Sequence, residues 1–219
     1  MDCWNKGLEI SFSAQSEAKV NDYEKMQEKI ADEKRNVEYR TSGVPEKFWN
    51  DSFDTFVVNN DEEQYAKNIA VSFSYSPENK VLVFCGSNGV GKTHLATSII
   101  REYGGEYITS SMLCLKYDSA IGYKAKMSRE EIIEHYISSP LLVIDDCCKY
   151  FLNSDLEKFI LLTIICGRYE NGKPTVLVSN AKKKDFIDFL GQAVFDRFTE
   201  VCKTIEFYCD SKRKQRRQW

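Results

Sequence analysis

The sequence contains no apolar run that approaches the roughly 20 residues needed to span a membrane. Its first residues, Met1-Asp2-Cys3-Trp4, also lack the basic start and apolar stretch of a secretory signal. Proline and histidine are scarce, with four and two residues among 219. The lack of apolar runs and of a signal argues against a membrane-spanning or secreted protein. We therefore expect a cytoplasmic protein with no membrane partner.

Cysteine is not scarce, since the chain has eight, but the spacing does not suit metal binding or disulfides. No C-x-x-C pair occurs and only two histidines are present, so we expect no zinc site. Cys85, Cys147, Cys148 and Cys166 lie within or beside apolar stretches. This placement is typical of reduced, buried thiols in a cytosolic protein.

The chain has no large excess of either charge, because 30 basic and 33 acidic residues give a net charge of −3. The basic residues are nevertheless uneven, and five of them crowd the last eight positions. Local clusters matter more than the total for binding a polyanion, so this end is a candidate nucleic-acid contact. An ordinary solvated terminus is the alternative. The five are Lys212, Arg213, Lys214, Arg216 and Arg217.

The first 42 residues differ in pattern from the rest. Residues 14–40 are densely charged with both signs, and an apolar stripe with helical spacing runs through them. A stripe this narrow predicts a helix that docks on a partner rather than a core helix, while a solvated lead-in is the alternative. Residues 41–45 break the pattern as a linker. The stripe consists of Tyr23, Met26, Ile30 and Val37.

From residue 44 onward, helical patterns alternate with short apolar runs, which predicts an α/β fold with a five-stranded parallel sheet covered on both faces. We expect a helical docking segment and linker over 1–42, a core over 43–209 and a basic tail over 210–219. No separate helical lid domain is visible. The expected strands are 81–85, 107–109, 141–144, 175–178 and 204–208, and the expected helices are 61–73, 94–103, 111–119, 128–136, 154–169 and two short ones over 183–198.

The segment after the first expected strand fits the P-loop pattern G-x-x-x-x-G-K-[ST] at every fixed position. Its glycines let backbone N–H groups turn toward a phosphate, and the following helix adds its positive N-terminal end. In that role Lys92 reaches the β- and γ-phosphates of ATP, and Thr93 ligates Mg²⁺. A glycine turn before an ordinary helix is the alternative. The expected nucleotide-binding residues are Gly86, Ser87, Asn88, Gly89, Val90, Gly91, Lys92, Thr93 and His94.

Two further expected strands end in polar residues, and in parallel sheets the ligand lies at the carboxyl ends of the strands. Asp145 follows an apolar strand as a Mg²⁺-holding carboxylate does, and Asp146 beside it is placed to orient the attacking water. Asn180 can hydrogen-bond the γ-phosphate or that water. Strand caps and surface turns are the alternatives for these residues.

Arg197 lies in a short amphipathic segment before the last expected strand. An arginine presented by a neighbouring subunit can stabilise the charge that develops on the γ-phosphoryl group. A surface ion pair with Asp196 or Glu200 is the alternative. An arginine that acts on a neighbouring subunit's nucleotide requires self-association through the ATP sites.

Taken in order, these residues resemble the AAA+ ATPases of the DnaC/DnaI type, the replicative helicase loaders of bacteria and their phages, over residues 43–213. The resemblance implies a P-loop NTPase of the AAA+ (ASCE) type that assembles under ATP control on single-stranded DNA and on a hexameric replicative helicase. It also implies Arg197 as an arginine finger and, through a Ser-x-Arg, Arg213 as a nucleotide contact. The matching segments are Gly43-Val44-Pro45, Asn50 to Phe53, GSNGVGKTHLA from Gly86, LLVIDD from Leu141, RY at Arg168, KPTVLVSN from Lys173 and LGQAVFDRF from Leu190.

Two features depart from that family. Many members carry Asp-Glu where this chain has Asp145-Asp146. The Asp146 side chain is one methylene shorter than glutamate, so its carboxylate lies farther from the attacking water and we expect slow hydrolysis. Members also generally carry a larger helicase-binding domain, sometimes with zinc, whereas the part before residue 43 contains Cys3 as its only cysteine. We expect partner docking to rest on one or two helices.

A second candidate nucleic-acid contact lies between the second and third expected strands, where aromatics and lysines are interleaved. Bases can stack on such rings while the cations follow the backbone of a single strand. An exposed amphipathic helix is the alternative. Together with Arg213, the expected DNA-contacting residues are Lys116, Tyr117, Tyr123 and Lys124.

The leading interpretation is therefore an oligomeric ATPase that loads a replicative helicase. An IstB-type transposition helper shares the same core but acts with a transposase. A nucleotide-gated adaptor with little turnover fits the Asp145-Asp146 pair, and a small-metabolite kinase fits least because no lid with phosphate-binding arginines is visible. A neighbouring helicase gene favours the loader, and a neighbouring transposase gene favours the helper.

Overall fold

The computed structural model describes residues 25–27, 29–121, 126–148 and 155–208, and the chain divides into two compact units, 1–38 and 39–219. In the first unit, residues 25–27 and 29–38 are helical, as expected. Met26, Ile30 and Val37 of the apolar stripe are 60%, 49% and 62% exposed, while Tyr23 lies outside the described residues. The docking role of this stripe stays a prediction.

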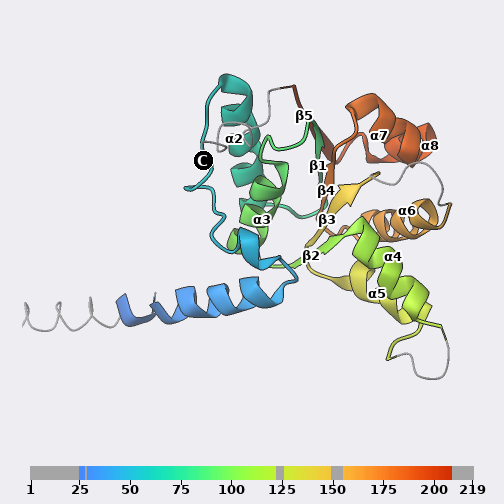
Figure 1. Cartoon of the computed structure of the whole chain (residues 1–219), viewed down its shortest axis with the longest axis horizontal. Coiled ribbons are helices and arrows are strands. Elements are labelled where there is room, and N and C mark those ends of the chain that lie inside the picture. Colours follow the sequence, from blue (N-terminus) through green and yellow to red (C-terminus); the bar gives the residue numbers. More distant parts are fainter. Residues whose placement is uncertain (1–24, 28, 122–125, 149–154, 209–219) are drawn as a thin grey trace, which may run out of the picture. The chain divides into compact units, whose positions relative to one another are not determined.

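The strands of the second unit run parallel in one five-stranded sheet, in the order β2-β3-β4-β1-β5 (Figure 1). The predicted fold class is thereby confirmed. The central strands are almost entirely apolar because both of their faces are covered by helices. The strands are β1 Val81–Gly86, β2 Glu106–Thr109, β3 Leu142–Cys147, β4 Thr175–Ser179 and β5 Cys202–Phe207.

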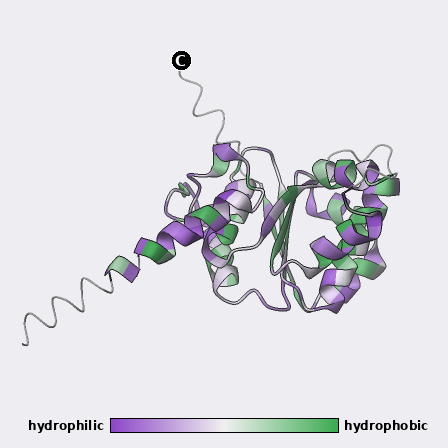
Figure 2. Ribbon diagram, turned by 90° about the horizontal axis from the view of Figure 1, so that it is seen from below, coloured by the Kyte–Doolittle hydropathy of each residue, from purple (hydrophilic) through white to green (hydrophobic). Residues whose placement is uncertain are grey.

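The side chains of β1 alternate between two apolar cores, one on each face of the sheet. Helices cover both of these faces (Figure 2). Leu82 and Phe84 pack with α2 and α3, whereas Val81 and Val83 pack with the helices of the other face. Full burial of such a side chain stabilises the fold by roughly 1.5–3 kcal/mol. None of the described helices is long and apolar enough to cross a membrane. The helices are η1 Glu46–Phe48, α2 Asp61–Tyr75, α3 Lys92–Tyr103, α4 Ser110–Ser119, α5 Arg129–Ser138, α6 Asp155–Glu170, α7 Lys183–Leu190 and α8 Gln192–Phe198.

The segment before η1 closes the outer edge of β2. The backbone N–H of Tyr107 donates to Ser42 O at 2.7 Å, which satisfies a group that an open strand edge would expose. Gly43 follows with φ +89°, and a Cβ there would meet Tyr107 O at 2.4 Å, so the close approach requires glycine. Tyr39 is only 3% exposed, which explains why the second unit begins four residues before the expected core.

A fully buried arginine lies at the amino edge of the sheet. Arg168, in the last turn of α6, donates from Nη1 to three carbonyls at the C-terminal end of α5, those of Tyr136, Ile137 and Ser139, at 2.6, 3.1 and 2.8 Å. Its remaining bonds reach the start of β4, with Nη2 donating to Pro174 O at 2.6 Å and Nε to Thr175 Oγ1 at 2.9 Å. Burial lowers the pKa of this guanidinium to about 10.

Candidate nucleotide-binding site

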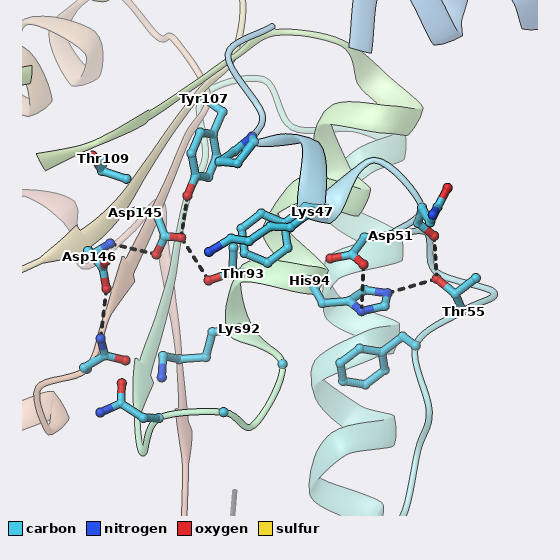
Figure 3. A pocket seen from close by; sticks show the side chains of 18 of the residues that line it. Lys47, Asp51, Thr55, Lys92, Thr93, His94, Tyr107, Thr109, Asp145 and Asp146 are labelled. Carbon is cyan, nitrogen blue, oxygen red and sulfur yellow. Dashed lines mark hydrogen bonds and ion pairs between the residues drawn. The ribbon is translucent and has the colours of Figure 1, made fainter. Parts of the chain in front are cut away.

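A cavity of about 1160 Å³ lies at the carboxyl ends of the strands, beside the loop that joins β1 to α3 (Figure 3). Four strands contribute to it, because the P-loop follows β1, Thr109 ends β2, the acidic pair lies just before the end of β3 and Asn180 follows β4. The structure brings together nine of the predicted site residues here, among them Lys92, Thr93, Asp145, Asp146 and Asn180. The other four are Asn88, Gly89 and Gly91 of the P-loop and His94 of α3.

The P-loop backbone takes conformations that only glycine adopts easily. Gly86, Gly89 and Gly91 have φ of 109°, 81° and 102°. A Cβ on Gly86 would meet Phe207 O at 2.2 Å, and one on Gly91 would meet the Phe56 ring at 2.5 Å. The loop therefore passes closely between β5 and the lead-in before it enters α3 at Lys92. Successive N–H groups at such a turn, followed by a helix N-terminus, form an anion site.

Lys92 lies folded across the loop rather than extended into solvent. It is 4% exposed, and its Nζ donates to Gly86 O at 2.9 Å and to Ser87 O at 2.7 Å. The Lys92 amine therefore lies inside the P-loop, where a bound phosphate would also lie. α3 begins at this residue, two residues before the expected His94, because the loop glycines end at Gly91.

Asp145 accepts hydrogen bonds from three directions. Thr93 Oγ1 donates to its Oδ2 at 2.9 Å, Tyr107 Oη donates to the same oxygen at 2.7 Å, and the Asp146 N–H donates to Oδ1 at 2.7 Å. Burial raises the pKa of Asp145, and these three donors oppose that rise. Burial, followed by the neighbouring carboxylate, also raises the pKa of Tyr107, so this phenol remains a donor.

A bulge turns the two acidic side chains in different directions. The register between β3 and β4 shifts between Ile144 and Cys147, and Asp146 lies there with φ +56°, which is uncommon for a residue other than glycine. Asp145 therefore faces Thr93, whereas Asp146 Oδ1 accepts from Asn180 Nδ2 at 3.0 Å. β3 thus continues to Cys147, beyond the expected end at Ile144.

The oxygen atoms of this site suit a hard divalent cation. The Thr93 hydroxyl and the Asp145 carboxylate are 2.9 Å apart, and both are ligands that Mg²⁺ accepts. In the described ranges, no group of three or more His, Cys, Asp or Glu is placed to hold a metal. Mg²⁺ at nucleotide sites takes one or two carboxylates together with phosphates and water, so the donor set fits Mg²⁺ accompanied by a nucleotide.

The lead-in over residues 45–57 forms a wall of the cavity that the sequence pattern did not predict. His94 in the first turn of α3 joins this wall to the P-loop helix. Its Nε2 lies 2.8 Å from Ser52 O and 3.2 Å from Thr55 Oγ1, and its Nδ1 lies 3.6 Å from Asp51 Oδ1. One indication of this wall is present in the sequence, because the segment from Asn50 to Phe53 resembles the lead-in of the family. The wall contributes Pro45, Lys47, Phe48, Asn50, Asp51, Thr55, Phe56 and Val57 to the lining.

Other predicted residues lie away from the cavity. Arg197 is exposed on α8 and is not among the described lining residues. Lys116 Nζ donates to Tyr136 Oη at 2.8 Å, and the Arg129 guanidinium lies 4.6 Å from the ring centre of Tyr117, so both candidate DNA contacts have partners within the chain. Their DNA role stays a prediction. Gly86, Ser87 and Val90 belong to the loop without lining the cavity, and Tyr123, Lys124 and Arg213 lie outside the described residues.

A parallel sheet whose P-loop, acidic strand end and polar strand end share one cavity defines an ATP-binding protein of the AAA+ P-loop class. The chain belongs to the family of IstB-like ATP binding proteins, whose model matches residues 11–219. The family match agrees with the class that the P-loop predicted.

Comparison with known proteins also confirms the resemblance to helicase loaders. The replicative helicase loader DnaC of Buchnera aphidicola is 24% identical over 163 residues, which cover 71% of this chain and 66% of the relative. The ATP-binding protein of insertion sequence IS232 from Bacillus thuringiensis is 31% identical over 156 residues, covering 67% of this chain and 60% of the relative. A crystal structure of the DnaC helicase loader matches with a TM-score of 0.62 and 25% identity, covering 74% of this chain and 99% of that one. The chain therefore spans less than two thirds of the length of these two curated relatives.

Proposed function

We propose that this chain binds ATP with Mg²⁺ in the cavity, hydrolyses it slowly, and uses the ATP-bound state to bring a replicative helicase onto single-stranded DNA. The nucleotide part rests on the 2.9 Å hydrogen bond between Thr93 Oγ1 and Asp145 Oδ2. This bond joins the loop after β1 to the acidic end of β3 at one point. In P-loop NTPases these two groups hold the metal that bridges the β- and γ-phosphates.

The chain's own groups divide the work on the triphosphate. The N–H groups of Asn88, Gly89 and Gly91, which line the cavity, and the N-terminus of α3 bind phosphate oxygens. Lys92 gives up its hydrogen bonds to the Gly86 and Ser87 carbonyls and donates instead to the β- and γ-phosphates. Asp146, held by Asn180, accepts a hydrogen bond from the attacking water and orients it. When bound, Mg²⁺ neutralises charge on the phosphates. Hydrolysis is slow because the Asp146 carboxylate is one methylene shorter than the glutamate common in the family.

Arg197 completes the ATP site of a neighbouring copy. It is exposed on α8 and is absent from the described lining of its own cavity, so it is available to another copy's nucleotide. A guanidinium at that position stabilises the negative charge of the transferring phosphoryl group. Hydrolysis therefore depends on self-association.

The proposed partners follow from the relatives and from two surfaces of the chain. DnaC is named a replicative helicase loader, and a helix with an exposed apolar stripe suits a groove on such a partner. The stripe is Met26, Ile30 and Val37, with Tyr23 before it. We assign the binding of single-stranded DNA to Lys116 and Tyr117 on α4, together with Tyr123, Lys124 and Arg213.

A transposition helper is the second candidate, because the IS232 relative is 31% identical and the matching family is IstB-like. The two candidates share the ATP site and differ in the partner. The test mixes the full chain and a non-hydrolysable ATP analogue with the replicative helicase of the same cell or with the transposase encoded nearest to its gene. Size-exclusion chromatography should yield a complex with the helicase alone. A complex with the transposase alone would establish the helper instead.

A pair of double variants tests whether the stripe carries the docking. Met26→Asp with Ile30→Asp should remove the helicase complex while ATP binding persists, because every proposed nucleotide contact lies in the second unit. Asp32→Ser with Arg35→Ser, an ion pair on another face of the same helix, is the matched control and should keep the complex. Full helicase binding by the first double variant would move the docking surface to the ATPase core.

A further inference from the structure

The carboxylate of Asp145 has one hydrogen-bond donor that belongs neither to the P-loop nor to its own strand. Tyr107 on β2 donates from Oη to Asp145 Oδ2 at 2.7 Å, while Thr93 and the Asp146 N–H supply the other two bonds (Figure 3). The Thr93 hydroxyl is itself a proposed metal ligand. Tyr107 therefore acts on the carboxylate from outside the proposed metal shell.

The fold holds this phenol in place from several sides. Parallel pairing sets Tyr107 opposite Val143 and Thr109 opposite Asp145, so the Tyr107 ring reaches forward along the strands to the carboxylate. The residue is 7% exposed and belongs to the apolar core that includes Leu141 and Val143. Its backbone N–H is bound to Ser42 O at 2.7 Å. A ring fixed at its backbone and along its sides presents its hydroxyl in one direction.

We propose that Tyr107 is a positioning residue for the metal-binding carboxylate of the ATP site. Its hydroxyl fixes Asp145 Oδ2 in the orientation that Mg²⁺ requires and compensates part of the burial of that charge. Groups that hydrogen-bond a metal ligand commonly tune affinity by 10–100-fold. The inference rests on the proposed ATP site, and it concerns the metal step rather than the binding of the nucleotide base or phosphates.

Tyr107→Phe is the direct test, because it keeps the ring in the core and removes only the hydroxyl. A fluorescent ATP analogue is bound to the full chain, first in EDTA and then with increasing Mg²⁺. We expect the Mg²⁺ concentration at half-maximal effect to rise about tenfold. The affinity in EDTA should stay within about twofold, since the Tyr107 hydroxyl donates to Asp145 and not to a P-loop residue. Tyr107→Leu removes the ring as well as the hydroxyl and should raise the Mg²⁺ midpoint by the same factor. An equal rise in both variants assigns the effect to the hydroxyl and not to the packing of the ring.

Tyr136→Phe is the matched control. Tyr136 is 3% exposed, its hydroxyl accepts from Lys116 Nζ at 2.8 Å, and it is not among the described lining residues of the cavity. Its Mg²⁺ midpoint should equal that of the wild type, and thermal unfolding should find all variants folded. If the wild type binds Mg-ATP, two results overturn this inference and leave the proposed function standing. These are a shift of the Mg²⁺ midpoint below about threefold in Tyr107→Phe, or an equal shift in Tyr136→Phe. A wild-type chain that binds no nucleotide overturns the proposed function and this inference with it.

Discussion

Two buried cations lie at opposite edges of the same sheet and meet very different surroundings. Arg168, at the amino edge, is fully buried and donates to five acceptors on α5 and at the start of β4. Lys92, at the carboxyl edge, is 4% exposed and donates to two carbonyls of its own loop while lining a large cavity. The two residues have nearly the same burial, so burial does not separate their roles.

The acceptors separate the roles. Arg168 joins elements that are distant in sequence, and three of its acceptors lie at the negative C-terminal end of α5, where a cation is favoured. Removing it would leave several buried carbonyls without donors. The carbonyls bound by Lys92 belong to a loop beside a cavity, and phosphate oxygens can replace them. The first arrangement indicates a structural cation and the second a ligand-binding one.

The largest expected effect follows from replacing the structural cation. Arg168→Met keeps the length and apolar stem but removes five hydrogen bonds, so the free energy of unfolding should fall by about 3–5 kcal/mol. Urea unfolding followed by circular dichroism measures this change. Arg197→Met, at an exposed arginine on α8, is the matched control and should stay within about 0.5 kcal/mol. A stable Arg168→Met chain that had lost ATP affinity would reverse the assignment.

The opposite pattern is expected at the carboxyl edge. Lys92→Ala should weaken binding of a fluorescent ATP analogue by at least about 100-fold, equal to roughly 2.7 kcal/mol, because the phosphates lose a charged donor. The free energy of unfolding should change by less than about 1 kcal/mol, since the lost bonds lie within one loop. Lys80→Ala, at an exposed lysine just before β1, controls for net charge. Unchanged affinity in Lys92→Ala would rule out the assigned site.

The sequence predicts the core well because its signals are local. Apolar runs place all five strands to within a few residues, and α5 begins next to the expected helix start at 128, with a capping box formed by Ser128 and Glu131. The residues of the strand ends converge because parallel topology leaves them no other edge. Topology alone therefore accounts for the meeting of Thr93, Asp145 and Asn180.

What the sequence misses depends on contacts between distant segments. Arg168 is one basic residue at the end of a helix, and its burial arises only when α5 and β4 meet around it. The wall over 45–57 has no periodicity, since η1 spans only Glu46–Phe48. Tyr107 fits an ordinary strand pattern, and the sequence does not indicate that its hydroxyl reaches Asp145. The left-handed conformation of Asp146 is not predicted, because the apolar run that indicates β3 stops before this residue.

A third cation, the exposed Arg197, extends the comparison to the contact between copies. Arg197→Ala removes the proposed finger and leaves the chain's own site intact, whereas Asp146→Asn disables the site and leaves the finger intact. Each variant alone should hydrolyse little ATP. In an equal mixture, an intact site meets an intact arginine at about one quarter of head-to-tail interfaces, so about one quarter of wild-type activity should return. Phosphate release measured against protein concentration checks this, and wild-type specific activity should rise with concentration.

Arg197→Ala mixed with the chain carrying both changes is the matched control and should recover nothing, because no intact arginine is present. Absence of recovery in the first mixture, or specific activity independent of concentration, would place Arg197 outside the ATP site and leave Lys92 as the one cation of the three that acts on the nucleotide.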